Sequence, residues 1–222
     1  MSSTTILSKQ LFHFLILISL RLYPSFMLTI RVQIDFLKSI YYIDSTKLAI
    51  CHNKRISSNR VFNRFSKIGK SSYGCFLGFK LHLVINNKGE LISVKITKGN
   101  KSDLSVASVI SKGLSGKLFG DKAYISKELF HQLFSNALRL FTNLRKAMQT
   151  YLLDIDDKLL LNKRSLIQSV FNVLKKHMHL EHTRHPSPLN FFVHIIASLS
   201  SYSISKLNPY LFSSSFSSFN LS

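Results

Sequence analysis

The feature that most limits how this chain can fold is an ordered succession of strand-like and helix-like segments between residues 39 and 204. Segments rich in β-branched and aromatic residues predict strands at 39–44, 75–85, 91–96, 117–121 and 138–144. Segments with apolar residues at helical spacing predict helices at 103–114, 126–137, 162–176 and 189–204. Turn residues at 86–89 join the second and third strands into a hairpin. Strands and helices in this order indicate an α/β fold with a mixed sheet.

Two of the predicted strands end at an aspartate, Asp44 and Asp121. Strand ends gather functional side chains in sheets of this kind, and the whole chain has only 10 acidic residues. Carboxylates on rigid elements can hold Mg²⁺, which prefers hard oxygen ligands. Aspartates at strand ends are equally common as turn or cap residues, and the pattern alone favours neither interpretation.

The charge balance indicates a polyanionic partner. Lys and Arg total 30 against 10 acidic residues, which gives a net charge of +20. Nucleic acid is the commonest partner for such a field, with an anionic membrane surface as the alternative. The densest basic stretch is either a contact for the DNA backbone or a solvated loop. Its cations are Lys54, Arg55, Arg60, Arg64, Lys67 and Lys70, and further candidate DNA contacts are Lys80 and His82 on one strand face, Lys122, Arg145 and Lys146.

The cysteines and the two ends of the chain limit the compartment and the domain organisation. Two cysteines without CxxC spacing favour a reducing cytoplasm. The apolar run at 11–20 is too short to span a bilayer, although it has the length of a signal-peptide core. We therefore expect no membrane partner. The expected organisation is an unplaced segment at 1–38, one domain at 39–207 and a low-complexity tail at 208–222.

Five motifs in order resemble the DDE transposase domain of bacterial insertion sequences. They are Ile43-Asp-Ser-Thr46, Gly78-Phe-Lys-Leu-His82, Lys98-Gly-Asn100 with Asp103, Gly120-Asp-Lys-Ala-Tyr124 and Glu181-His-Thr-Arg-His185. The resemblance implies an RNase H-like mixed sheet of about five strands flanked by helices. It implies DNA cleavage and strand transfer with two Mg²⁺ ions, and Asp44 and Asp121 as catalytic metal ligands. The implied partners are insertion-sequence ends and target DNA, with a homo-oligomer as the active form.

The third catalytic acid of the family is where the chain departs most from the pattern. Arg164-Ser-Leu-Ile-Gln-Ser-Val-Phe171 matches the helix motif that carries this acid, but Gln168 stands where the family has Glu. A neutral amide brings no charge and cannot act as a base, so we expect catalysis to be lost. Rescue from Asp154, Asp156 or Asp157 is not expected, because these lie in a loop-like stretch, which leaves Glu181 as the next acid along the chain.

Other departures and open assignments surround this prediction. Ala123 stands where the family commonly has Gly, and would strain the turn if that position needs a positive φ. The usual N-terminal DNA-binding region is not recognisable, which a truncation or frameshift would explain. The cap of the helix at 103–114 is Ser102 or Asp103, and for Asp103 a role as helix cap is preferred to a role as auxiliary acid. A zinc site is the minor alternative for the histidines, His177, His179, His182 and His185.

The sequence therefore predicts a degenerate DDE transposase with Asp44, Asp121 and Gln168 in the catalytic positions. The alternatives are an inert basic DNA-binding remnant, another RNase H-like nuclease such as a junction resolvase, and a basic protein attached to a membrane through residues 11–20.

Overall fold

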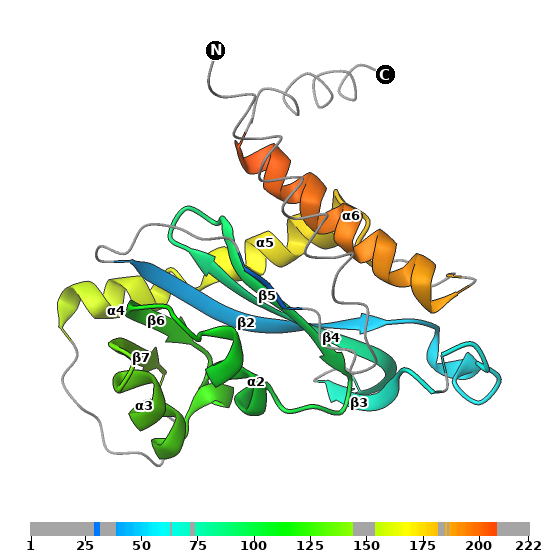
Figure 1. Cartoon of the computed structure of the whole chain (residues 1–222), viewed down its shortest axis with the longest axis horizontal. Coiled ribbons are helices and arrows are strands. Elements are labelled where there is room, and N and C mark those ends of the chain that lie inside the picture. The colour runs from blue at the N-terminus through cyan, green and yellow to red at the C-terminus, as the bar shows by residue number, and fades with distance from the viewer. Residues whose placement is uncertain are drawn as a thin grey trace.

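The computed structural model describes residues 29–31, 39–62, 64–71, 74–143, 154–181, 185 and 187–207 (Figure 1). The strands are β1 (Thr29–Arg31), β2 (Ile40–Ala49), β3 (Lys67–Ser71), β4 (Gly74–Asn86), β5 (Leu91–Lys98), β6 (Gly116–Gly120) and β7 (Leu138–Thr142). The helices are α2 (Asp103–Ile110), α3 (Lys127–Phe134), α4 (Ile155–Asn162), α5 (Ser165–Lys176) and α6 (Pro188–Leu207), with short 3-10 helices η1 (Asn53–Arg55) and η2 (Lys122–Tyr124).

All the strands belong to one mixed sheet in the order β1-β5-β4-β2-β6-β7. The strand β4 runs antiparallel to β2 and β5, whereas β2, β6 and β7 are parallel to one another. The additional strand β3 pairs antiparallel with the beginning of β4, beyond the end of β5. The five strands expected from the sequence form the path β5-β4-β2-β6-β7, which confirms the RNase H-like mixed sheet.

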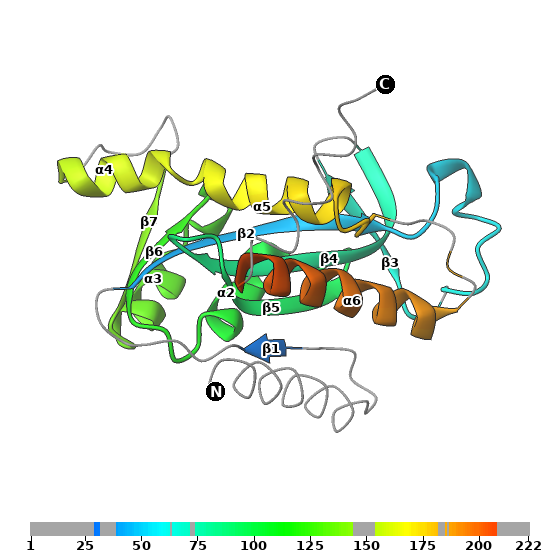
Figure 2. The same cartoon turned by 90° about the horizontal axis from the view of Figure 1, so that it is seen from above.

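Helices cover both faces of the sheet (Figures 1 and 2). On one face, α2 and α3 pack on a core that includes Tyr41 and Ile43 of β2. On the other face, α4, α5 and α6 cover a core that includes Tyr42 and Leu48. Because successive side chains of a strand point to opposite faces, Asp44 lies on the α5 side of the sheet with Tyr42.

Gly78 in β4 lies where three strands approach closely. It pairs with Ala49 of β2 and with Lys67 of β3, and its carbonyl accepts a hydrogen bond from the Gly99 N–H. A Cβ atom built at this position would lie 2.0 Å from the carbonyl oxygen of Leu48. Only glycine fits there without moving the main chain of a neighbouring strand.

The expected strands and helices are all present, with shifted ends, and four expectations are corrected. The strand expected to end at Asp44 continues to Ala49 as β2, so Asp44 lies within a strand and not at its end. The stretch taken as a loop around Asp154, Asp156 and Asp157 begins helix α4, and the buried Asp157 forms an ion pair with Lys117 of β6. The basic stretch is not only a loop, since it contains η1 and β3. The strain considered at Ala123 does not arise, because this residue lies in the helical turn η2 and positive φ values of described non-glycine residues occur elsewhere.

The segment at 1–38, in which the sequence placed nothing, contributes β1, which pairs antiparallel with β5 at one edge of the sheet. Within the described ranges, no helix has the length and apolar character that crossing a membrane would require.

Candidate functional site

The two aspartates predicted from strand ends come together at the centre of the sheet. Parallel pairing sets Tyr42 of β2 opposite Phe119 of β6, and Asp44 and Asp121 each follow two residues after this pair, near enough for the charge of Asp121 to act on Asp44. Neighbouring strands lie about 4.8 Å apart. Asp121 ends the extended chain because the main chain turns into η2 directly after it. The sheet therefore presents two carboxyl groups side by side, facing α5.

The two carboxyl groups are in different electrostatic environments. Burial raises the pKa of Asp44 from 3.8 to about 6, against the opposing effects of the Ser45 N–H and of Arg164, and the nearby Asp121 and Asp103 add to the rise. Partial burial alone would raise the pKa of Asp121, but hydrogen bonds from Arg164 and from the Lys122 N–H, together with the charges of both residues, outweigh burial and lower the pKa of this carboxyl. At neutral pH the Asp121 charge is stabilised within the protein, while the Asp44 charge is costly.

Arg164 supplies the cation at this site. It lies at the N-terminus of α5, and its Nη1 atom donates a hydrogen bond of 2.7 Å to Oδ1 of Asp121. Gln168 follows four residues later, on the same face of α5. Its side chain is exposed. In the sequence Arg164 is only one position of a motif, and nothing local indicates that it would contact the second aspartate.

Asp103 occupies the opposite side of β2 from Arg164. It accepts a hydrogen bond of 2.8 Å from Oγ of Ser45 and one of 3.2 Å from Nζ of Lys80. The interpretation of Asp103 as the helix cap is wrong, because Ser102 caps α2 by accepting from the Ser105 N–H. Asp103 instead belongs to the polar surroundings of Asp44.

His82 and Lys80 share the strand face that points toward Asp103, as their alternation predicts. The His82 ring is 1% exposed, bonds to Oγ1 of Thr97 through Nε2 over 2.9 Å, and has Nδ1 3.7 Å from the Asp103 carboxylate. Burial lowers the pKa of His82 to about 4, so the ring is neutral at pH 7. Contact of Lys80 and His82 with DNA stays a prediction, and both side chains are here directed to Asp103.

Tyr124, at the end of η2, lies beside the same carboxyl groups. Burial, with Asp103, Asp44 and Asp121 adding to it, raises the pKa of the phenol well above its ordinary value. Its hydroxyl is buried and has no hydrogen-bond partner among the described residues. The motif at 120–124 contains Tyr124, but nothing in the sequence indicated a role for it.

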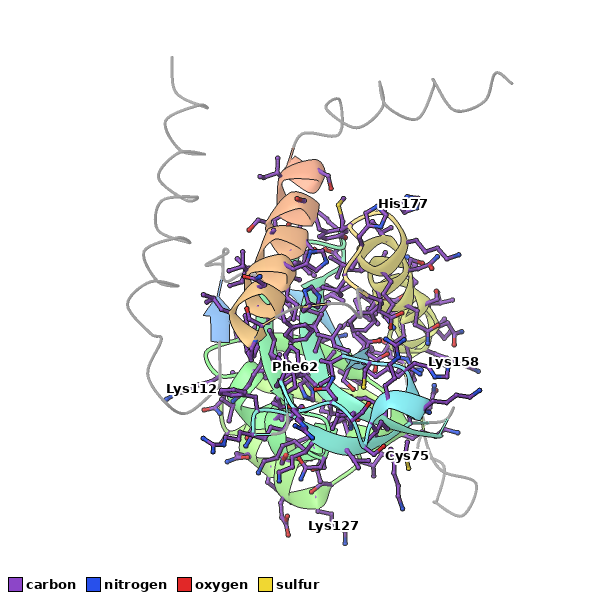
Figure 3. All side chains as sticks on the ribbon, turned by 90° about the vertical axis from the view of Figure 1, so that its right-hand side faces the viewer. Phe62, Cys75, Lys112, Lys127, Lys158 and His177 are labelled. Carbon is purple, nitrogen blue, oxygen red and sulfur yellow. The ribbon has the colours of Figure 1, made fainter. Side chains whose placement is uncertain are left out.

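The basic stretch forms an exposed surface next to β4. All six of its cations, Lys54, Arg55, Arg60, Arg64, Lys67 and Lys70, have exposed side chains. The stretch is anchored by Phe62, which is 1% exposed and packs edge-on against Phe191 of α6 with ring centroids 5.7 Å apart. Figure 3 shows Phe62 within the body of the protein and Cys75 of β4 at its surface. Lys122 is exposed next to Asp121.

The second pair of candidate DNA contacts and the histidine cluster lie partly or wholly outside the described residues. Arg145, Lys146 and His182 lie outside the described residues. His177 and His179 are exposed, while His185 packs against Phe191. Across the described part of the chain, no three His, Cys, Asp or Glu side chains are grouped so that they could hold a metal ion.

Comparison with known proteins identifies one family. The family described as transposase DDE domain matches residues 35–188. Comparison with curated proteins finds no match. Among solved structures, the chain is similar to a chain of the simian T-cell lymphotropic virus intasome in complex with the PP2A regulatory subunit B56 gamma, with 15% identity and a TM-score of 0.40 over 78% of this chain and 53% of that one. It thus spans about half the length of the intasome chain.

The second structure is the large terminase nuclease from thermophilic phage G20c with bound magnesium. The identity is 9% and the TM-score 0.28, over 80% of this chain and 88% of the nuclease. Likenesses as distant as these two do not bear on function.

Proposed function

The family match covers most of the sequence, so this chain belongs to the transposase DDE domain family, and we propose that it is an insertion-sequence transposase whose DNA cleavage is lost or strongly impaired. The observation that carries this proposal is the position of Gln168. Arg164, one turn earlier on α5, bonds to Asp121, so α5 turns this face toward the carboxyl pair. The third acid of the family belongs on that face, and an amide stands there instead.

The carboxyl pair fits a divalent cation in part. Asp44 within β2 and Asp121 directly after β6 offer hard oxygen ligands, and a cation would relieve the cost of ionising the buried Asp44. We propose these two residues as the Mg²⁺ ligands. When bound, Mg²⁺ would stabilise the negative charge that develops on the phosphate during cleavage. Two Mg²⁺ ions are expected from the family, and two carboxylates are a poor set for both.

The residues of this chain explain why the site is weakened. Gln168 can offer an amide oxygen but no charge and no basic group. Arg164 already neutralises Asp121 through the 2.7 Å hydrogen bond, so this carboxylate would have to exchange an internal cation for a metal ion. Both effects lower the affinity of the site for a second cation.

DNA binding does not depend on this chemistry. The net charge of +20 and the six exposed cations of the basic stretch favour the phosphate backbone. We propose that insertion-sequence ends and target DNA lie along this stretch and reach the carboxyl pair past Lys122. We also propose that residues 39–207 form the catalytic domain and that an active form is a homo-oligomer.

Cleavage by matched variants tests the catalytic part of the proposal. The substrate is a supercoiled plasmid carrying the genomic DNA that flanks the coding sequence, incubated with Mg²⁺ or Mn²⁺. We expect Gln168→Glu to cut on the order of 100-fold faster than the native chain. Ser169→Glu is the control, because it adds the same charge to the exposed neighbouring position of α5.

The outcomes separate the alternatives. Equal cleavage by the native chain and Gln168→Glu would show that Gln168 is not at the position of the missing acid. Cleavage by neither, together with salt-sensitive DNA binding, would favour an inert DNA-binding remnant. Cutting that follows the shape of the DNA, not the flanking sequence, would favour another RNase H-like nuclease.

Salt dependence tests the DNA-binding surface. Affinity for a short duplex is measured by fluorescence anisotropy between about 50 and 200 mM salt. Lys67→Gln with Lys70→Gln should lower the slope of log affinity against log salt by about 0.9 for each phosphate that the variant no longer neutralises. Lys112→Gln with Lys127→Gln is the matched control, since these exposed lysines lie after α2 and on α3. Equal changes in the two double variants would contradict a localised DNA surface.

A further inference from the structure

Ser45 connects two carboxyl groups that lie on opposite faces of the sheet. Its main-chain N–H donates a hydrogen bond of 2.8 Å to Oδ1 of Asp44, and its hydroxyl donates one of 2.8 Å to Oδ1 of Asp103. Strand β2 pairs with β6 only from Ile40 to Tyr42. Beyond Tyr42, the main-chain N–H groups on this edge of β2 do not pair with β6. The Ser45 N–H donates instead to the side chain of Asp44.

Asp103 is fixed independently of Ser45. It is the first residue of α2, whose N-terminus is capped by Ser102. Its carboxylate also accepts from Nζ of Lys80 at 3.2 Å, and both side chains are mostly buried, at 17% exposure for Lys80 and 23% for Asp103. Nδ1 of His82 lies 3.7 Å from Oδ1 of Asp103, which is too far for a hydrogen bond, but the buried ring packs beside this carboxylate. The acceptor that Ser45 meets is therefore a rigid, charged group.

We propose that Asp103 is a positioning residue for the metal site and acts through Ser45. By holding the Ser45 hydroxyl, it fixes the amide that orients the Asp44 carboxylate toward the cation. This inference rests on the proposed metal-binding role of Asp44 and Asp121. Hydrogen bonds made by the neighbours of metal ligands orient those ligands, and their loss typically lowers metal affinity 10- to 100-fold.

A single residue makes both of these hydrogen bonds. A serine directly after the metal-binding aspartate reaches the opposite face with its side chain, because the side chains of a strand alternate. Among the other residue types, threonine alone also carries an aliphatic hydroxyl, and its extra methyl group is compatible with a strand. The chain therefore offers a conservative substitution that keeps the proposed contact, and a truncation that removes it.

Binding of Mn²⁺, counted by electron paramagnetic resonance, tests the proposal on the full chain. The Mn²⁺ binding that is lost in the Asp44→Asn variant is assigned to the proposed metal site. We expect Ser45→Ala and Asp103→Ala each to weaken this binding about 10-fold or more. Ser45→Thr should retain the affinity of the native chain. Ser93→Ala is the matched control, since the Ser93 hydroxyl is buried on β5 and has no hydrogen-bond partner within the described residues.

Thermal unfolding of the metal-free variants separates positioning from a purely structural role. A structural role alone would lower the unfolding midpoint while leaving Mn²⁺ affinity of the folded protein unchanged, and this result would overturn the inference. Unchanged affinity in both Ser45→Ala and Asp103→Ala would overturn it as well, with the metal site intact. Absence of any Mn²⁺ binding that depends on Asp44, in the native chain and in Gln168→Glu, would overturn the metal site and the inference together.

Discussion

Replacing Asp44 with asparagine should stabilise the metal-free protein at neutral pH, although it removes a proposed metal ligand. Burial raises the pKa of Asp44 from 3.8 to about 6. A carboxyl group whose pKa is higher in the folded than in the unfolded chain binds its proton more tightly when folded. Stability therefore falls as the pH rises from about 4 through about 6, and stays lower above that range. At about 1.4 kcal/mol per pH unit, the full penalty is about 3 kcal/mol.

Asparagine keeps the shape of Asp44 and an oxygen that can accept from the Ser45 N–H, but it carries no charge. We expect a gain of about 1 to 3 kcal/mol in the free energy of unfolding near pH 7.5. The measurement is urea unfolding in the presence of a chelator at a series of pH values from about 4 to 8. The native and Asp44→Asn curves should converge toward the acid end of this range.

The neighbouring carboxyl group provides a control of opposite sign. Because Arg164 lowers the pKa of Asp121, this ionised group stabilises the fold above its ordinary pKa, and the stabilisation is lost as the pH falls. Asp121→Asn should therefore destabilise the protein at neutral pH. The reasoning would be refuted if Asp44→Asn were no more stable than the native chain near pH 7.5, or if its gain did not change with pH.

Four further substitutions test the packing of the fold by urea unfolding and circular dichroism. Lys117→Met leaves the buried Asp157 without its ion-pair partner and should cost about 3 kcal/mol; Asp157→Asn should cost less, since Lys117 can reach water, and equal costs would contradict this. Tyr202→Phe removes a buried hydroxyl that donates over 2.6 Å to the main chain of the β4–β5 turn, and should cost about 1 to 2 kcal/mol; an unchanged free energy of unfolding would count against that bond. Gly78→Ala places a methyl carbon 2.0 Å from the carbonyl oxygen of Leu48, so the variant should fail to fold; a native-like spectrum and unfolding midpoint would show that the strands can separate to admit it.

The sheet and the carboxyl pair could be predicted because their signals are local. A strand carries a period of two in its own sequence, and the place where it ends can be read from the residues that follow. Asp121 comes directly after such an end, whereas β2 continues through Asp44 to Ala49, so the strand end expected at Asp44 is wrong. The parallel pairing of β2 and β6 then brings the two aspartates to the same part of the sheet.

The contacts around the pair could not be predicted because they depend on how distant elements dock. Asp103 was interpreted as a cap from its local sequence, yet its partners Ser45 and Lys80 come from two strands. Asp157 lay in a charged run that resembled a loop, and it became buried because Lys117 of β6 neutralises it. Each of these contacts joins residues whose separation in sequence carries no periodic signal.

For the proposed loss of DNA cleavage, the Arg164–Asp121 ion pair has a consequence for the order in which site residues would be replaced. Selection for a folded protein is expected to retain Asp121, because its carboxylate is the ion-pair partner of Arg164. Position 168 is exposed on α5, so mutation there is invisible to selection for a folded protein, and only selection for DNA cleavage would preserve an acid. Asp44 destabilises the metal-free fold at neutral pH, because burial disfavours its charged form. Once cleavage ceases to be selected, genetic drift is expected to remove the third acid first and Asp44 next, while Asp121 outlasts both.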